Sequence, residues 1–126
     1  MSVLTQPPTM GDVLKYELNP HYTRETVTLL AGTSYAVGAV LGRITASGKM
    51  KLSTATGTDG AQNAAAVLLY DVDATAADTT GIVVLRGPAI VSKAALVFDA
   101  SVDDAAKKAA KHAQLTAIGI VPRDAA

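Results

Sequence analysis

Few residues of this chain have the chemistry needed for acid–base or nucleophilic catalysis. The sequence contains two histidines, His21 and His112. His21 lies between Pro20 and Tyr22, and His112 follows a group of lysines. A hydrolytic triad of the nucleophile-elbow type needs a serine between glycines on a strand-to-helix turn, and the sequence has no such motif. We therefore expect two surface histidines and no catalytic set.

The acidic and glycine-containing turns are also poor candidates for a metal or cofactor site. Asp71 and Asp73 lie two residues apart at a predicted strand end. A Ca²⁺ site needs six or more oxygen ligands, and the surrounding sequence lacks the EF-hand loop pattern. Thr58-Asp59-Gly60 lacks the Walker and Rossmann glycine spacings, so it predicts a tight turn. We expect no metal and no cofactor.

The charge balance argues against a nucleic-acid partner. The chain has 11 Lys+Arg and 11 Asp+Glu, so its formal net charge is zero. Binding driven by counterion release needs a basic surface instead. The one group of lysines, Lys107, Lys108 and Lys111, is offset by Asp103 and Asp104 and predicts a solvated helix face.

The composition indicates a single domain that is partly covered in an assembly. The chain has 126 residues and no cysteine, so disulfides and thiolate metal sites are excluded. Hydrophobic residues make up 49% and charged residues 17% of the chain, against a typical charged share of about 25%. Its apolar stretches are far shorter than the ~20 residues that span a bilayer, so we expect no membrane partner.

The first twenty-one residues differ from the rest. Pro7-Pro8 favours an extended path and has no amide hydrogen to donate. Residues 12–18 alternate apolar and polar side chains until Asn19-Pro20 ends the pattern. We expect residues 1–21 to form a flexible arm that is disordered alone and orders against a partner by adding a strand.

Residues 22–126 are predicted to form one β-rich domain. Apolar and β-branched runs predict strands at Arg24–Leu30, Val37–Thr45, Lys49–Leu52, Ala64–Val72, Gly81–Leu85, Ala89–Val91 and Ile120-Val121. Ser47-Gly48 separates the second and third runs and predicts a hairpin. Pro122 is expected to end the last strand.

One helix is predicted near the C-terminus, over residues 102–118. Ser101 and Asp104 match a capping box at its start, and Gly119 fits the left-handed position after its end. Small apolar residues recur along one side and predict its packing face: Val102, Ala106, Ala109, Ala113 and Ala117. Leu115 and Ile118 extend this apolar face near the end of the helix.

The motifs, in their order and spacing, resemble a known family. They are Gly11–Leu14, Arg24–Leu29, Gly38–Ile44, Gly48-Lys49, Thr58–Gly60, Ala64–Thr75, Val83–Gly87 and the helix Asp103–Gly119 followed by Ile120-Val121. Each is common alone, but together they cover most of the chain. The chain is similar to the lambda-type bacteriophage head decoration proteins, the capsid-stabilising protein D family.

The resemblance implies a fold, a role and partners. The fold is mainly β, a β-clip-like small β body with one C-terminal α-helix and an extended N-terminal arm. The role is structural and not enzymatic. A homotrimer binds the major capsid protein at three-fold and quasi-three-fold sites of the expanded icosahedral head and stabilises it against the pressure of packaged DNA. Such a protein is made in the host cytoplasm and is located on the outer surface of the virion capsid.

Within this resemblance, the N-terminal arm is expected to dock on the capsid. Deleting residues 1–21 is expected to leave a folded trimer that no longer binds heads. The residues expected to contact the capsid are Pro7, Pro8, Val13, Leu14, Tyr16, Leu18, Tyr22 and Arg24. No trimer-interface residue is assigned from the sequence.

Two other functions remain open at this point. One is a different virion module, in a tail or a fibre. The other is a small trimeric β-clip domain with an enzymatic or ligand-binding site between its subunits, although the sequence offers few clustered polar groups for such a site.

Overall fold

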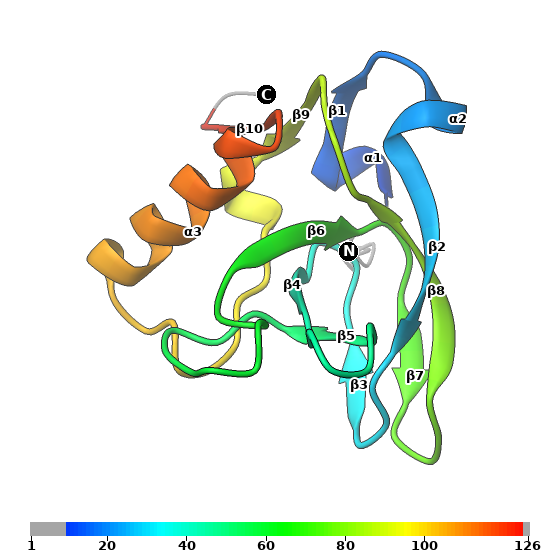
Figure 1. The fold of residues 1–126 in the computed structure, drawn as a ribbon. Helices are drawn as coiled ribbons and strands as arrows, with labels where there is room; N and C mark the ends of the chain where they lie inside the picture. Colours follow the sequence, from blue (N-terminus) through cyan, green and yellow to red (C-terminus); the bar gives the residue numbers. More distant parts are fainter. Residues whose placement is uncertain (1–9, 125–126) are drawn as a thin grey trace, which may run out of the picture.

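A small β structure with one long helix makes up the part of the chain that the computed structural model describes, residues 10–124 (Figure 1). Strands account for 38% of the described residues and form three sheets, which confirms the expected mainly β fold with a C-terminal helix. The strands are β1 (Leu14–Glu17), β2 (Arg24–Leu29), β3 (Thr33–Tyr35), β4 (Val40–Arg43), β5 (Met50–Leu52), β6 (Ala64–Leu68), β7 (Val72–Ala74), β8 (Thr79–Val84), β9 (Ala89–Ser92) and β10 (Ile120–Arg123). The helices are α1 (Met10–Val13), α2 (Pro20–Thr23), the 3-10 turn η1 (Lys93–Ala95) and α3 (Ala105–Ala117).

Five strands close into a barrel in the order β2-β5-β4-β6-β8. The β2 and β8 strands pair antiparallel over six residues, from Arg24 opposite Val84 to Leu29 opposite Thr79. The β4 and β5 strands form the antiparallel hairpin that Ser47-Gly48 predicts. Buried apolar side chains of the barrel strands and of neighbouring segments form one core cluster: Val27, Leu29, Tyr35, Ala39, Leu41, Met50, Ala66, Leu68, Ala74 and Val83.

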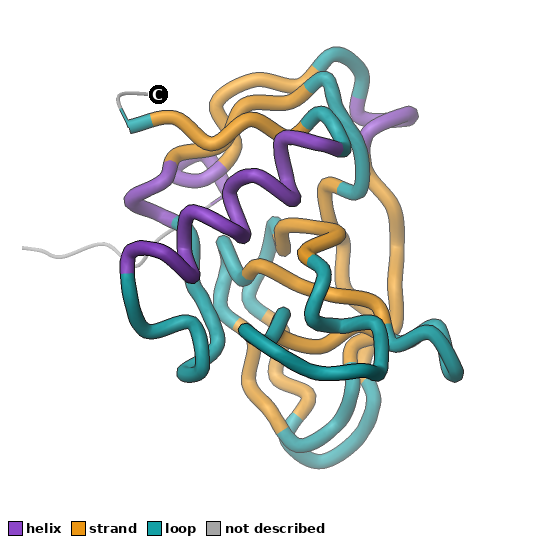
Figure 2. Tube along the Cα trace, turned by 60° about the vertical axis from the view of Figure 1, so that its left-hand side comes forward, coloured by secondary structure: helices purple, strands orange, loops and turns teal. Residues whose placement is uncertain are grey.

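A three-stranded sheet with the order β1-β9-β10 lies beside the barrel. The β9 strand pairs antiparallel with β1 and parallel with β10, and α3 makes the crossover that a parallel pair requires (Figure 2). One face of this sheet packs on Leu115 of α3 in a second core cluster. The β10 strand continues through Pro122 to Arg123, past the predicted end. An edge strand tolerates proline because its outer side needs no amide donor.

The long apolar run Ala64–Val72 does not form one buried strand. It divides into β6 and β7, with a turn between them in which Leu69 is fully buried and Tyr70 is 45% exposed. The β7 strand leaves the barrel and pairs instead with β3. This separation places the exposed Tyr70 and the neighbouring Asp71 at the molecular surface.

The helix α3 begins three residues later than predicted. Asp104 is its N-cap and accepts a hydrogen bond from the backbone N of Lys107 at 2.8 Å. Ser101 is not part of the cap, because its hydroxyl donates to Asp99 and accepts from the backbone N of Ala55. Gly119 has a φ of +85°, as expected for the residue after a helix.

The predicted packing face of α3 is correct for Leu115 but wrong for its alanines and for Ile118. The side of the helix that faces the protein carries Lys111 and Leu115, which are 2% and 0% exposed. The four alanines of the predicted stripe, at positions 106, 109, 113 and 117, are exposed. Lys111 and Leu115 lie four residues apart and therefore share a face, which the group of neighbouring lysines concealed.

Candidate docking surface

The two histidines lie on different helices and do not form a catalytic pair with a described nucleophile. His21 is exposed on α2. His112 on α3 is only partly exposed, contrary to the surface position expected, and its ring meets Phe98 edge-on with centroids 5.8 Å apart. Its buried Nε2 has no hydrogen-bond partner among the described residues. Burial lowers the pKa of His112, and the charges of Lys93 and Lys108 lower it further.

The acidic residues considered for a metal or cofactor site have local roles. Asp73 accepts hydrogen bonds from the backbone N and Oγ1 of Thr75, which hold its pKa below the ordinary value. Asp59 forms an ion pair with Lys51 at 2.7 Å and accepts from the backbone N of Ala61. Residues 10–124 contain no group of three or more side chains arranged to hold a metal ion. In the same range, no helix combines the length and apolar character of a membrane span.

The N-terminal segment is folded against the body from Met10 onwards. Val13 is 0% exposed in the core, and β1 pairs with β9. This differs from an arm that runs freely to residue 21, because Val13 and Leu14 pack against apolar residues of the second core cluster. Pro7 and Pro8 lie outside the described residues.

The β1 strand contributes to an apolar row on the outer face of its sheet. Tyr16 stands opposite Ile90 of β9, and Ile90 stands opposite Val121 of β10. Paired residues in a sheet point to the same face. The neighbouring row, Glu17 with Ala89 and Ile120, points the other way, and Ala89 and Ile120 are buried. The outer row is therefore apolar and partly exposed.

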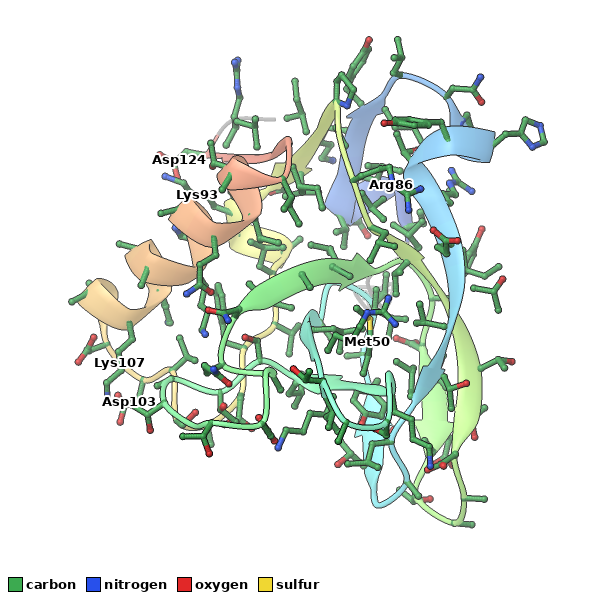
Figure 3. The ribbon with its side chains drawn as sticks, viewed as in Figure 1. Met50, Arg86, Lys93, Asp103, Lys107 and Asp124 are labelled. Atoms are coloured by element: carbon green, nitrogen blue, oxygen red, sulfur yellow. The ribbon has the colours of Figure 1, made fainter. Side chains whose placement is uncertain are left out.

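The short helix α2 presents a second aromatic residue. Asn19 caps it by accepting from the backbone N of His21, and Pro20 occupies its first turn. Arg86, which Figure 3 shows beside α2, lies 5.5 Å from the ring centroid of Tyr22 and donates to the Tyr22 carbonyl oxygen. These contacts fix the position of Tyr22 while its side chain stays exposed.

Arg24 stabilises this corner of the molecule and is already engaged. Its Nε donates to Glu17 at 3.0 Å, and its Nη2 donates to the same carboxylate oxygen at 2.5 Å. Burial raises the pKa of Glu17, but hydrogen bonds from Arg24 and Thr23, together with the charge of Arg24, leave that pKa below the ordinary value. The ion pair joins β1 to β2 across α2.

We call Tyr16, Leu18 and Tyr22 the N-terminal surface. They are 49%, 60% and 55% exposed, and they are three of the seven large hydrophobic residues that are exposed in the described part of the chain. The sequence pattern predicted these three as contact residues. The pattern did not indicate Ile90 and Val121, because strand register, which a single sequence does not specify, places Ile90 beside Tyr16 and Val121 beside Ile90. Such a surface can bury aromatic and aliphatic side chains against a protein partner.

The comparisons with known proteins agree with this structural role. A family model described as bacteriophage lambda head decoration protein D matches residues 3–120. The match therefore covers nearly the whole chain, including the N-terminal surface. A search of curated proteins found no match.

Proposed function

The chain belongs to the bacteriophage lambda head decoration protein D family, and on this basis we propose that it acts as a homotrimer that reinforces the expanded phage head. The family is structural and not enzymatic, and its members sit on the capsid surface. In our proposal the trimer occupies three-fold and quasi-three-fold sites and holds neighbouring capsid subunits together against the pressure of packaged DNA.

We assign capsid contact to the N-terminal surface. The observation that carries this assignment is the presence of three exposed large side chains, Tyr16, Leu18 and Tyr22, within seven residues of the first described segment. Tyrosine and other aromatic residues commonly supply most of the binding free energy at interfaces. Pro7 and Pro8 precede this surface and extend the proposed contact.

The structure changes which of the sequence-predicted residues belong in this assignment. Val13 is in the core and Arg24 is paired with Glu17, so we assign both a supporting role. Leu14 is partly buried against the second core cluster and supports β1. Three linked copies of the N-terminal surface would bind at high effective concentration, so each single contact can be weak.

Cosedimentation with purified heads tests the proposed contact. The variant carries Tyr16→Ser, Leu18→Ser and Tyr22→Ser, all at exposed positions, so its fold is expected to persist. We expect wild-type protein to sediment with expanded, undecorated heads and not with unexpanded procapsids. The triple variant should bind expanded heads at least tenfold more weakly, since each lost apolar contact removes about 1 kcal/mol or more.

The matched control carries Ala109→Ser and Ala113→Ser on the exposed side of α3. It makes apolar-to-serine changes at a different surface and is expected to bind like wild type. Normal binding by the triple variant would contradict the assignment of the N-terminal surface. Failure of the wild-type protein to bind any head would contradict the proposed function itself.

A further inference from the structure

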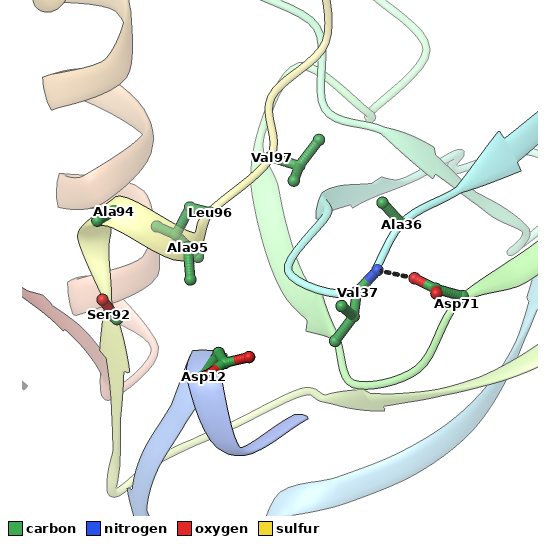
Figure 4. Close-up of a pocket in the computed structure, with 9 residues that line it drawn as sticks. All are labelled: Asp12, Ala36, Val37, Asp71, Ser92, Ala94, Ala95, Leu96 and Val97. Atoms are coloured by element: carbon green, nitrogen blue, oxygen red, sulfur yellow. Dashed lines mark hydrogen bonds between the residues drawn. The ribbon is translucent and has the colours of Figure 1, made fainter. Parts of the chain in front are cut away.

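A second group of exposed hydrophobic residues lines two adjoining hollows. The first, of about 490 Å³, lies between α1, η1 and the loop before β4, and includes the exposed Val97 beside the buried Val37 (Figure 4). The second, of about 380 Å³, lies over β2 and β8 and includes Tyr70 and Ile82. The hollows share Asp71. We call this combined feature the Asp71 groove.

The Asp71 groove is lined by negatively charged side chains and by no positively charged one. The charged residues that line it are Asp12 and Asp71, which enter the first hollow from different elements (Figure 4). Asp71 Oδ1 accepts a hydrogen bond from the backbone N of Val37 at 2.8 Å. Oδ2 has no hydrogen bond to a described residue. Apolar walls beside a carboxylate suit an arginine or lysine, whose aliphatic stem and charged head match both parts.

This chain carries a suitable cation of its own. Each of the other ten lysines and arginines makes a hydrogen bond, an ion pair or a ring contact within residues 10–124. The guanidinium of Arg123 makes none with any described residue, and Arg123 is exposed at the end of the edge strand β10. It lies two residues after the half-buried Val121 on the same strand.

We propose that the Asp71 groove of one copy receives the β10 edge of a second copy, with Arg123 of that copy paired to Asp71. The inference rests on the proposed function, because it assigns the contact that forms the trimer. A three-fold ring needs two different complementary surfaces on every subunit. On each subunit the two surfaces adjoin, because Arg123 stands opposite Ser92 in the β9–β10 register and Ser92 lines the first hollow.

A charge exchange between the two surfaces tests this pairing. The mass of the full-length protein in solution is measured by light scattering over a range of concentrations. Wild type is expected to be a trimer. Asp71→Arg and Arg123→Asp should each raise the concentration for half-dissociation at least tenfold. The double variant, which restores opposite charges, should recover the trimer.

Two controls separate this effect from damage to the fold. Asp71→Asn keeps an oxygen that can accept from Val37 and removes only the charge, so it should weaken the trimer while circular dichroism stays unchanged. Asp73→Arg makes the same charge change two residues away, outside the groove, and should leave the trimer intact.

The alternative outcomes are distinguishable. A wild-type protein that remains monomeric at every concentration would contradict the proposed trimer and this inference together. Single variants that remain trimeric would overturn the inference and leave the proposed function standing. Trimeric variants that no longer bind heads would mean that the groove receives the capsid protein, and this result would also overturn the inference. Disrupted single variants without recovery in the double variant would exclude Arg123 as the partner.

Discussion

The ammonium group of Lys111 lies inside the protein although it is ionisable. Its Nζ donates to the carbonyl oxygens of Thr54 at 2.6 Å and Gln62 at 2.5 Å. Both carbonyls belong to the long connection between β5 and β6, so Lys111 ties that connection to α3. Burial lowers the pKa of Lys111, because removal from water disfavours its charged form. The two hydrogen bonds offset part of that cost.

Replacing Lys111 should therefore destabilise the fold. Lys111→Met keeps the long apolar stem but leaves two carbonyl oxygens without their donor. We expect the free energy of unfolding to fall by about 1–3 kcal/mol, the usual cost of unpaired buried polar groups. Urea denaturation at one fixed protein concentration measures this, since association changes apparent stability.

Lys108→Met is the matched control for this prediction. Lys108 lies on the exposed side of the same helix, so its replacement should change the free energy of unfolding by no more than about 0.5 kcal/mol. If the two variants are equally stable, the hydrogen bonds of Lys111 contribute nothing measurable to the fold.

The burial of individual polar residues was the feature that the sequence pattern predicted least well. Lys111 has the same side chain as Lys107 and Lys108, and the sequence predicted one solvated face for all three. The structure buries Lys111 because carbonyl oxygens from a distant loop meet its ammonium group. His112 was expected at the surface, but the distant Phe98 partly covers it. Contacts of this kind depend on tertiary structure, which local pattern does not encode.

At the scale of elements, local pattern predicted most strands but not their partners. The β-branched run at Arg24–Leu29 and the hairpin at Ser47-Gly48 follow from the sequence. The order β1-β9-β10 does not, because it joins segments from both ends of the chain. Only the packing of a shared core fixes such long-range pairs.

The N-terminal segment is a second case in which local pattern did not predict long-range pairing. Its prolines and its short alternating run predicted an arm through residue 21, whereas the structure folds the chain against the body from Met10. Val13 supplies the physical reason, since its side chain is fully buried against the second core cluster. Deletion of residues 1–21 would therefore remove a core side chain and a paired strand as well as the proposed docking residues.

A single substitution tests whether this segment belongs to the body. Val13→Ala removes two buried carbon atoms and leaves a cavity, so we expect a loss of about 2 kcal/mol in the free energy of unfolding. Leu18→Ala, at a position that is 60% exposed, should have little effect and serves as the control. Equal denaturation midpoints for the two variants would mean that the segment is not packed as the structure describes.

At the scale of the whole molecule, exposed apolar residues gather in separate places. Tyr16, Leu18 and Tyr22 form the N-terminal surface, while Tyr70, Ile82 and Val97 line the Asp71 groove. The low share of charged residues predicted that part of the surface is covered in an assembly. It did not predict where, because each surface is built from segments that are distant in sequence. Two separate contact surfaces suit a protein that binds both its own copies and a shell.

Cryo-electron microscopy of expanded heads incubated with the protein tests the central claim most directly. The account predicts density for three copies at each three-fold and quasi-three-fold site, with the N-terminal surface toward the capsid and the Asp71 groove between copies. Heads without added density, or density confined to the tail, would contradict the account.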